Sequence, residues 1–580
     1  MVKFSFKLLV NIIVLCLGLI ISGCSSKGRS DRENLRSLMA SQNWAAALKL
    51  IETSDFYKEE NSKLLGLLES GTIKHYQGHY FQSIQFLNQA RDLSRELYTR
   101  SISAQAKTLV ANDNFDDYFG APYERSMIHY YLGLNHFLLY QTGVKEEMQV
   151  AEQVIPAQTL SPQERQQHLL SARAEMLAWD GLLKVFVNSR EGAVYKEDLL
   201  GRVLAGLIHE AIGTRDELQI SLQLYKDSLG ILTKYYGAYP SFNQSFKKFV
   251  ADYKKLPTLP KDKLKTEYFQ TTENFQATEI YLKRKVLQLT QQLYPKDLPS
   301  VRKEFDLTLE QQKEILGDSK NGETNIVVIL NEGLVPPVEP STQYFGLDYA
   351  QYNSEAARVV AAVGSVALGL FAANTLGLQP APQNWNPVGA QLGLEVATTM
   401  ARGLAISFEL PVVNPTPPPA VAELVITMGE NNLEQRFKLP LAQVIGDISR
   451  QAIAEDSVSR YGRVGLRVIM KHLTAIVASY GTYKLIAKED DATSKFLARN
   501  AAVIQYLAAS RGIAETEKAD TRHWSSLPQS VRLIDLQLPP GEYSMRLESG
   551  ARVIHLDKLV VPEVQSGKIL HLSHLSGVES

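Results

Sequence analysis

The sequence predicts an α+β protein of more than one domain, with an all-helical N-terminal half and a C-terminal half built around a mainly antiparallel sheet. Residues 30–317 contain few prolines and place apolar residues at helical spacing. The β-branched run at 325–330, bounded by glycine and proline, then marks the start of a second domain at 322–580. The chain of 580 residues is also longer than the roughly 250–300 residues that one hydrophobic core usually serves.

The chain begins with a pattern typical of a secretory signal. Two lysines precede an uncharged apolar stretch at residues 8–21. The sequence Ile21-Ser22-Gly23-Cys24 that closes this stretch resembles the lipobox of bacterial lipoproteins. We therefore expect residues 1–23 to be a lipoprotein signal peptide, Cys24 to be the acylated first residue of the mature chain, and residues 24–29 to be its tether. An ordinary cleaved signal and an uncleaved membrane anchor are the alternatives.

The residue after the lipobox indicates a location. Ser25 stands where an aspartate would favour retention in the inner membrane, and it resembles the sorting pattern of outer-membrane lipoproteins. We expect a chain that is anchored by lipid such as palmitate to the bacterial outer membrane and faces the periplasm. The net charge of -1 shows no excess of positive charge of the kind that attracts nucleic acid. Only Cys16 and Cys24 are present, so no disulfide is expected in the mature protein.

Turn-forming residues recur in the helical half. Gln42, Gly78, Gly143 and Gly213 are separated by 36, 65 and 70 residues, or about one, two and two periods of a 34-residue helical repeat. This spacing predicts tetratricopeptide-like repeats over 30–317, which would leave a concave face for a protein partner. An unrelated helical bundle is the alternative.

Several short apolar runs in the C-terminal half predict strands, and longer periodic segments between them predict helices. The strands are expected at 325–330, 404–413, 422–427, 433–439, 531–538, 543–547, 552–561 and 568–573, and the helices at 441–455, 457–480 and 492–510. Pro411 cannot donate to a ladder, so its strand should lie at a sheet edge or stop early.

Residues 359–394 contain no charged side chain. Two strips of small residues, each with a spacing of four, predict a closely packed helical hairpin at 355–402. The strips comprise Ala361, Ser365, Gly369, Ala373 and Gly377, and then Gly389, Gly393, Ala397 and Ala401. This hairpin would enter a membrane, pack against the sheet, or associate with other copies of the chain. Glu395 and Arg402 favour packing or self-association.

The sequence offers little that indicates catalysis. His75 and His79 have a spacing that suits a helical metal site, but no third ligand accompanies them. His571 and His574 should point to opposite faces of a strand. The chain has no nucleophile elbow, no phosphate-binding loop and no free cysteine. We therefore expect neither an enzyme nor a bound cofactor or metal.

Two polar clusters are candidate binding or structural motifs. Arg460, Arg463 and Arg467 share one face of a predicted helix, where they would contact an anionic partner or solvent. A second cluster comprises Asp520, Thr521, Arg522 and Trp524. It would form either a partner-binding motif or a fixed turn in which Asp520 bonds Arg522 and Trp524 packs beneath.

These residues also carry a resemblance. The segments concerned are 123–125, 133–135, 331–336, 461–463, 519–528 and 539–543. Together they resemble a family of tetratricopeptide-containing bacterial outer-membrane lipoproteins without an assigned reaction. Genes of that family often lie near those of lipoproteins that activate penicillin-binding proteins, so the resemblance implies a part in envelope assembly. The Ala/Gly-rich segment departs from the commoner pattern.

The expected function is therefore that of a non-catalytic scaffold that binds proteins of the cell envelope. A homo-oligomer is one possible state of this scaffold. One alternative is a component of an outer-membrane pore or secretion assembly that uses the 359–402 hairpin. The other is an enzyme that acts on the cell wall.

Overall fold

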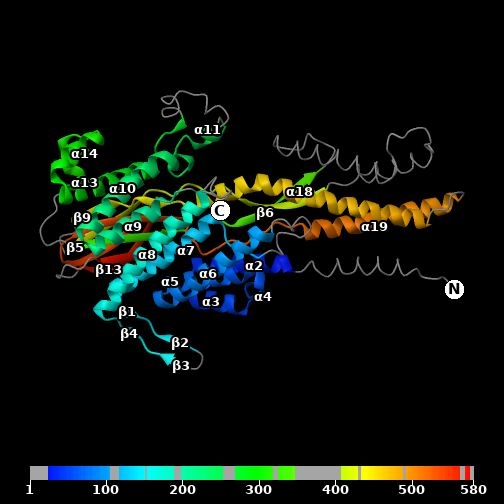
Figure 1. Cartoon of the computed structure of the whole chain (residues 1–580), viewed down its shortest axis with the longest axis horizontal. Helices are drawn as coiled ribbons and strands as arrows, with labels where there is room; N and C mark the ends of the chain where they lie inside the picture. The colour runs from blue at the N-terminus through cyan, green and yellow to red at the C-terminus, as the bar shows by residue number, and fades with distance from the viewer. Residues whose placement is uncertain are drawn as a thin grey trace.

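The computed structural model describes residues 24–104, 117–150, 153–187, 197–251, 268–317, 324–345, 406–428, 433–486, 491–561 and 568–574. Packed helices form the N-terminal region and mainly antiparallel sheets form the C-terminal region, so the predicted α+β class is confirmed at this level. Figure 1 shows an elongated body from which two long helices project as an arm. The predicted signal peptide and the predicted hairpin at 355–402 lie outside the described residues, which begin at Cys24.

The N-terminal region consists mainly of α-helices. They are α2 (Cys24–Ala40), α3 (Trp44–Thr53), α4 (Asp55–Lys58), α5 (Lys63–Tyr76), α6 (Tyr80–Ala104), α7 (Pro122–Thr142), α8 (Pro162–Val187), α9 (Leu199–Ile212), α10 (Arg215–Tyr235), α11 (Phe246–Ala251), α13 (Glu273–Leu293), α14 (Leu298–Glu304) and α15 (Leu309–Leu316). Residues 24–29, expected as a tether, form the first turns of α2. The predicted turns are confirmed, because Gln42, Gly78, Gly143 and Gly213 all have positive φ angles, between 55° and 76°.

Two short antiparallel pairs interrupt the helices after Gly143, where the sequence predicted no strand. They are β1 (Val144–Lys145) with β4 (Gln158–Thr159), and β2 (Met148–Val150) with β3 (Gln153–Ile155). Gly143 ends α7 in the left-handed conformation, and Pro156 cannot continue a helix. The chain therefore returns as a short ribbon to Pro162, where α8 begins.

The C-terminal region contains two four-stranded sheets and a two-stranded ribbon. Its strands are β5 (Thr324–Glu332), β6 (Val338–Phe345), β7 (Ile406–Val413), β8 (Ala422–Met428), β9 (Leu433–Lys438), β10 (Leu441–Gln443), β11 (Ser530–Leu538), β12 (Gly541–Ser549), β13 (Arg552–Val561) and β14 (Lys568–His574). The sheet orders are β10-β11-β5-β14 and β13-β12-β8-β9, while β6 pairs with β7. All these pairs are antiparallel except β14 with β5.

The structure corrects several predicted elements. β6 and β10 were not predicted, and the helices expected at 441–455 and 457–480 are one helix, α18 (Ile445–Ile486), which follows β10. The next helix, α19 (Ala492–Thr516), was predicted six residues shorter. β7 continues past Pro411 to Val413 and pairs only with β6 among the described strands, so it lies at a sheet edge, which is one of the two outcomes predicted for it. Pro411 faces Pro340 in β6. Because neither proline has an N–H group, the two missing donors fall at the same position of the ladder.

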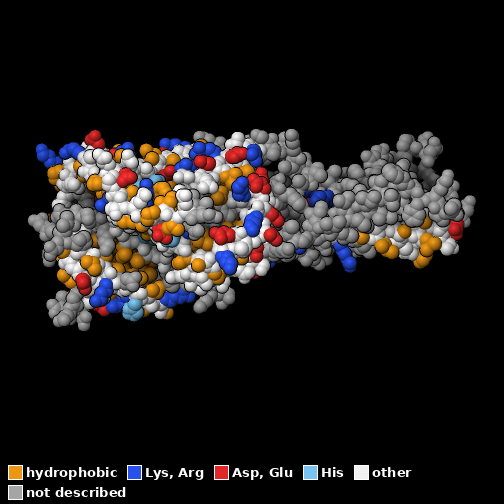
Figure 2. All heavy atoms as spheres, turned by 90° about the horizontal axis from the view of Figure 1, so that it is seen from below, with side chains coloured by type: hydrophobic (Ala, Val, Ile, Leu, Met, Phe, Trp, Pro, Cys, Tyr) orange, Lys and Arg blue, Asp and Glu red, His pale blue; other side chains and the backbone are white. Residues whose placement is uncertain are grey.

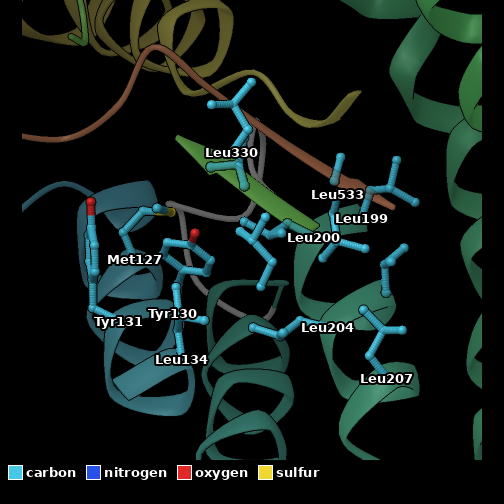
Figure 3. Close-up of a cluster of buried hydrophobic side chains, with 14 of the residues drawn as sticks. Met127, Tyr130, Tyr131, Leu134, Leu199, Leu200, Leu204, Leu207, Leu330 and Leu533 are labelled. Carbon is cyan, nitrogen blue, oxygen red and sulfur yellow. The ribbon is translucent and has the colours of Figure 1, made fainter. Parts of the chain in front are cut away.

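Buried apolar side chains of both regions form one continuous cluster, where the sequence suggested separate cores. In Figure 3, Tyr130 and Leu134 of α7 and Leu204 of α9 lie beneath Leu330 of β5 and Leu533 of β11. Two helices thus cover one face of the sheet that contains β5 and β11. The helical region and this sheet fold as one body, and the contacts between them define the candidate site.

In the ranges that the structure describes, none of the helices combines the length and apolar character needed to cross a membrane. The pore alternative depends on the uncharged hairpin, which these ranges do not include.

Candidate functional site

The predicted Asp520-to-Trp524 cluster lies at the contact between the two regions, in a segment that we call the interface loop (residues 520–526). Trp524 has no exposed surface. Its backbone N–H donates to Glu124 Oε1 of α7 at 2.7 Å, and its indole Nε1 donates to Thr72 Oγ1 of α5 at 2.9 Å. The loop is therefore bound to two helices that lie 400 and 452 residues earlier in the chain.

Two buried glutamates bind the backbone of the interface loop. Glu69 of α5 accepts the N–H groups of Ser525 and Ser526 at 2.7 and 3.1 Å, as well as the Ser525 hydroxyl. Glu124 also accepts the Tyr118 hydroxyl at 2.6 Å. In all of these hydrogen bonds the glutamate oxygens are the acceptors, which is the role of an ionised carboxylate.

Burial opposes that ionisation. It raises the pKa of Glu69, although hydrogen bonds from Ser526 and Ser525 counteract the rise. It also raises the pKa of Glu124 to about 6, against hydrogen bonds from Trp524 and Tyr118. Hydrogen bonds from the interface loop and its surroundings thus oppose the effect of burial on the pKa of both carboxyl groups.

The first part of the interface loop is a fixed turn, which was one of the two predicted alternatives. Arg522 Nε and Nη2 donate to the two carboxylate oxygens of Asp520 at 2.9 and 2.8 Å, and its Nη1 donates to the Asn61 carbonyl at 2.7 Å. Thr521 Oγ1 accepts a bond from Arg32 Nη2 of α2 at 2.7 Å. The cluster therefore holds the regions together, and its buried Trp524 is inaccessible to a partner.

The predicted arginine face has an internal partner at one position. Arg467 Nη2 lies 3.0 Å from Glu517 Oε2, and Lys471 Nζ lies 2.5 Å from Glu517 Oε1. Both Arg467 and Glu517 are buried. The expectation that Arg467 contacts solvent or an anionic partner is therefore wrong, because it ties α18 to the residue that follows α19. Arg460 and Arg463 lie on the same helix, α18.

The histidines do not form the helical pair considered from the sequence. His75 Nδ1 lies 2.6 Å from Asn135 Oδ1, and its Nε2 lies 3.3 Å from His571 Nε2 of β14. Burial lowers the pKa of His75 to about 4. Within the described ranges, no group of three or more His, Cys, Asp or Glu side chains is arranged to hold a metal ion.

A groove in the helical region was not predicted. It is open to solvent, measures about 490 Å³ including its mouth, and lies between α8, α9 and α10. Its apolar lining is supplied by Met176, Leu177, Trp179, Leu183, Ala205, Ile220 and Leu224. Leu177 and Ile220 are 63% and 45% exposed although both are large and apolar. An apolar patch that is open to water in this way is a candidate contact for a partner.

The groove also has a shaped floor and a charged edge. The Trp179 ring forms part of the floor, and Gly201 packs on it so closely that an added Cβ would lie 3.2 Å from the ring. At the edge, Arg202 Nη2 pairs with Asp180 Oδ1 at 2.5 Å and lies 3.6 Å from Glu197. Sequence reasoning missed this groove because leucines and isoleucines on its three helices follow the same spacing as core residues.

The site thus comprises a buried interface loop and an open groove with an apolar lining. Comparison of the chain with protein-family models, with curated proteins and with solved structures gives no significant match.

Proposed function

We propose that this chain is a lipid-anchored outer-membrane scaffold that binds an envelope protein through its helical region and has no catalytic role. The observation that carries the proposal is the groove between α8, α9 and α10, with exposed Leu177 and Ile220 beside the Asp180–Arg202 ion pair. An apolar centre with a charged edge has the composition of a protein-binding surface. The lipid anchor at Cys24 follows from the lipobox-like sequence.

We further propose that the helical region contains tetratricopeptide-like repeats. The helix pairs α5–α6 and α9–α10 support this, because both carry Leu-Leu-Gly in the first turn and place two later glycines at the same offsets. In one pair the Ser83 hydroxyl donates to the Gly71 carbonyl at 2.6 Å, and in the other the Ser221 hydroxyl donates to the Gly206 carbonyl at 2.9 Å. A Cβ on either glycine would lie 2.7 Å from a side chain of the second helix.

A site-specific photocrosslinker tests the binding role. Placed at Leu177 in intact cells, it is expected to capture a defined envelope protein, and Ile220→Asp should abolish the capture because it places a charge in the apolar groove. A crosslinker at Leu309, which is 52% exposed on α15, is the matched control. Equal capture from both positions, or capture that survives Ile220→Asp, contradicts the proposal.

Metabolic labelling tests the anchor separately. Radioactive palmitate should label the wild-type protein and leave Cys24→Ser unlabelled. An unlabelled wild-type protein, or a labelled Cys24→Ser variant, contradicts anchoring at this residue.

A further inference from the structure

Among the residues that the structure describes, hydrogen bonds and ion pairs fix the α18–α19 arm to the body at its base. At its base Glu517 accepts Arg467 and Lys471, and the Glu409 N–H of β7 donates to the Glu517 carbonyl at 3.1 Å. Beyond Arg467, α18 continues for 19 residues to Ile486, or about 28 Å at the helical rise of 1.5 Å. This length projects from the body in Figure 1.

The two helices of the arm pack against each other through small and polar residues. Ala498 and Ala502 of α19 are fully buried. His472 Nδ1 lies 2.9 Å from the Tyr506 hydroxyl, and the Thr482 hydroxyl donates to Gln505 Oε1 at 2.6 Å. Among the described side chains, small and polar residues thus form the contact between the two helices, and large apolar residues on other faces are exposed.

Large apolar side chains collect toward the tip of the arm. Leu485 and Ile486 end α18 with 76% and 39% of their surface exposed. Phe496, Leu497 and Ile504 follow on α19 with 65%, 57% and 67%. Figure 2 shows apolar side chains gathered along the described part of the arm. This is the most exposed group of large apolar residues among the described side chains.

Two other features leave the body at the base of the arm. The first is α2, which begins at Cys24 in the chain and lies at the same end of the body as the arm (Figure 1). Its Arg36 Nη1 donates to the Ser525 carbonyl of the interface loop, which follows α19 in the chain. The second is the ribbon of β6 and β7, which is bonded to the base of the arm through Glu409 and whose ends, Phe345 and Ile406, face each other.

We propose that the tip of the arm, by which we mean the exposed side chains of Leu485, Ile486, Phe496, Leu497 and Ile504, inserts into the headgroup boundary of the bilayer that holds Cys24. This second contact would set the orientation of the body relative to the bilayer. The proposal takes the anchor at Cys24 from the proposed function. The connection at 487–491 reads Ala-Lys-Glu-Asp-Asp, so apolar burial rather than attraction to anionic lipid must supply the binding.

The test uses the mature chain, residues 24–580, with Cys24→Ser, which contains no other cysteine. A polarity-sensitive fluorophore is attached at Leu497→Cys and, as the control, at Val553→Cys on β13, since the two residues are 57% and 55% exposed. Two vesicle preparations of phosphatidylethanolamine with brominated acyl chains, one poor and one rich in phosphatidylglycerol, are then added. We expect the fluorophore at residue 497, and not the one at residue 553, to show a blue shift and quenching by bromine. Neither signal should be stronger in the vesicles that are rich in phosphatidylglycerol.

Paired substitutions provide a second measurement. Phe496→Asp with Leu497→Asp should weaken vesicle partitioning at least about tenfold, because two large apolar side chains no longer enter the boundary. Val553→Asp with Val560→Asp, at 55% and 53% exposed positions, should leave partitioning unchanged. These positions are exposed, so circular dichroism should show the same fold in every variant.

Three results would overturn the proposal. A label at 497 that is shielded without vesicles in a monomeric protein would show that the chain's own uncharged segment covers the tip. Shielding that accompanies a dimer in sedimentation would assign the tip to a second copy. A label that stays exposed with and without vesicles would remove the contact altogether. Because acylation is absent in this test, its result is independent of palmitate labelling.

Discussion

The interface loop and the base of the arm both use buried carboxylates, but they use them differently. Glu69 and Glu124 accept backbone N–H groups of the loop, so each helix holds the main chain of a distant segment. At the arm, Glu517 accepts Arg467 and Lys471, which belong to the neighbouring helix. The first arrangement joins two regions across the whole core, whereas the second joins two helices that already lie side by side.

This difference has an energetic consequence. Removing the carboxylate of Glu69 or Glu124 leaves buried N–H groups of the interface loop without an acceptor, in a segment that cannot move without opening the core. Removing the charge of Glu517 affects a hairpin that is attached at one end and whose far end is exposed. We therefore expect global unfolding effects at the loop and local effects at the arm.

The largest effect is expected for Glu69→Ala. Two backbone N–H groups and one hydroxyl would lose their acceptor in a fully buried site, so the free energy of unfolding should fall by about 4–5 kcal/mol. Urea denaturation measures this. Glu60→Ala, whose side chain is 83% exposed, should change the value by less than about 0.5 kcal/mol. Similar values for both variants would refute the role given to Glu69.

The next effect concerns pH. Burial, with Arg32 nearby, lowers the pKa of His523 to about 3, from an ordinary value of 6.5. The unfolded chain therefore binds a proton that the folded chain does not, and stability present above pH 6.5 is lost as the pH falls. Between pH 6.5 and 4 this amounts to about 3 kcal/mol.

His523→Asn isolates that contribution. The asparagine side chain does not titrate, and its amide offers an N–H that can replace the imidazole at the Thr521 carbonyl. Thermal unfolding from pH 7 to 4 should show a smaller loss of stability in this variant than in the wild type. Glu124, whose pKa burial raises to about 6, acts in the opposite sense in both proteins, so the difference between them is the informative quantity. The same loss in both proteins would show that His523 does not contribute.

A smaller and local effect is expected for Glu517→Gln. The amide keeps hydrogen-bonding capacity but loses the charge that Arg467 and Lys471 face, so opening of the arm should become easier by about 2 kcal/mol. Hydrogen exchange should become faster in α18 and α19 while the strands β5 and β11 keep their protection. Equal acceleration in both places would show that the arm and the body unfold together.

The smallest effect is expected at the tip. Leu497→Ser in the non-acylated chain should change the free energy of unfolding by less than about 0.5 kcal/mol, because the side chain is 57% exposed. Leu533→Ser on β11, where the side chain is 1% exposed, should instead cost about 3 kcal/mol or more. Denaturation curves of the two variants make the comparison.

Strands with continuous apolar or alternating patterns were predictable from the sequence. β8, β11 and β13 lie within one residue of their predicted bounds because their own side chains specify a buried face. β6 was missed because Pro340 and a run of polar residues hide its pattern, and β10 because three residues carry no period. The break expected near residue 456 was wrong, since Asp456 and Ser457 lie inside α18.

The candidate site was only partly predictable. The turn between Asp520 and Arg522 is local, so residue types and spacing were enough to indicate it. Glu69 and Glu124 were not predictable as its acceptors, because a glutamate in a helix ordinarily faces water. Their role depends on contacts between residues 400 or more positions apart, and no short-range pattern records such contacts.

The parallel pairing of β14 with β5 constrains how this protein is made. β5 is complete once residue 332 has been synthesised, yet its two neighbours, β11 and β14, begin only at residues 530 and 568. Both edges of β5 therefore lack these partner strands until almost the whole polypeptide has been synthesised. A nascent chain that terminates early would carry an open edge, which makes truncated products natural targets for chaperones and proteases.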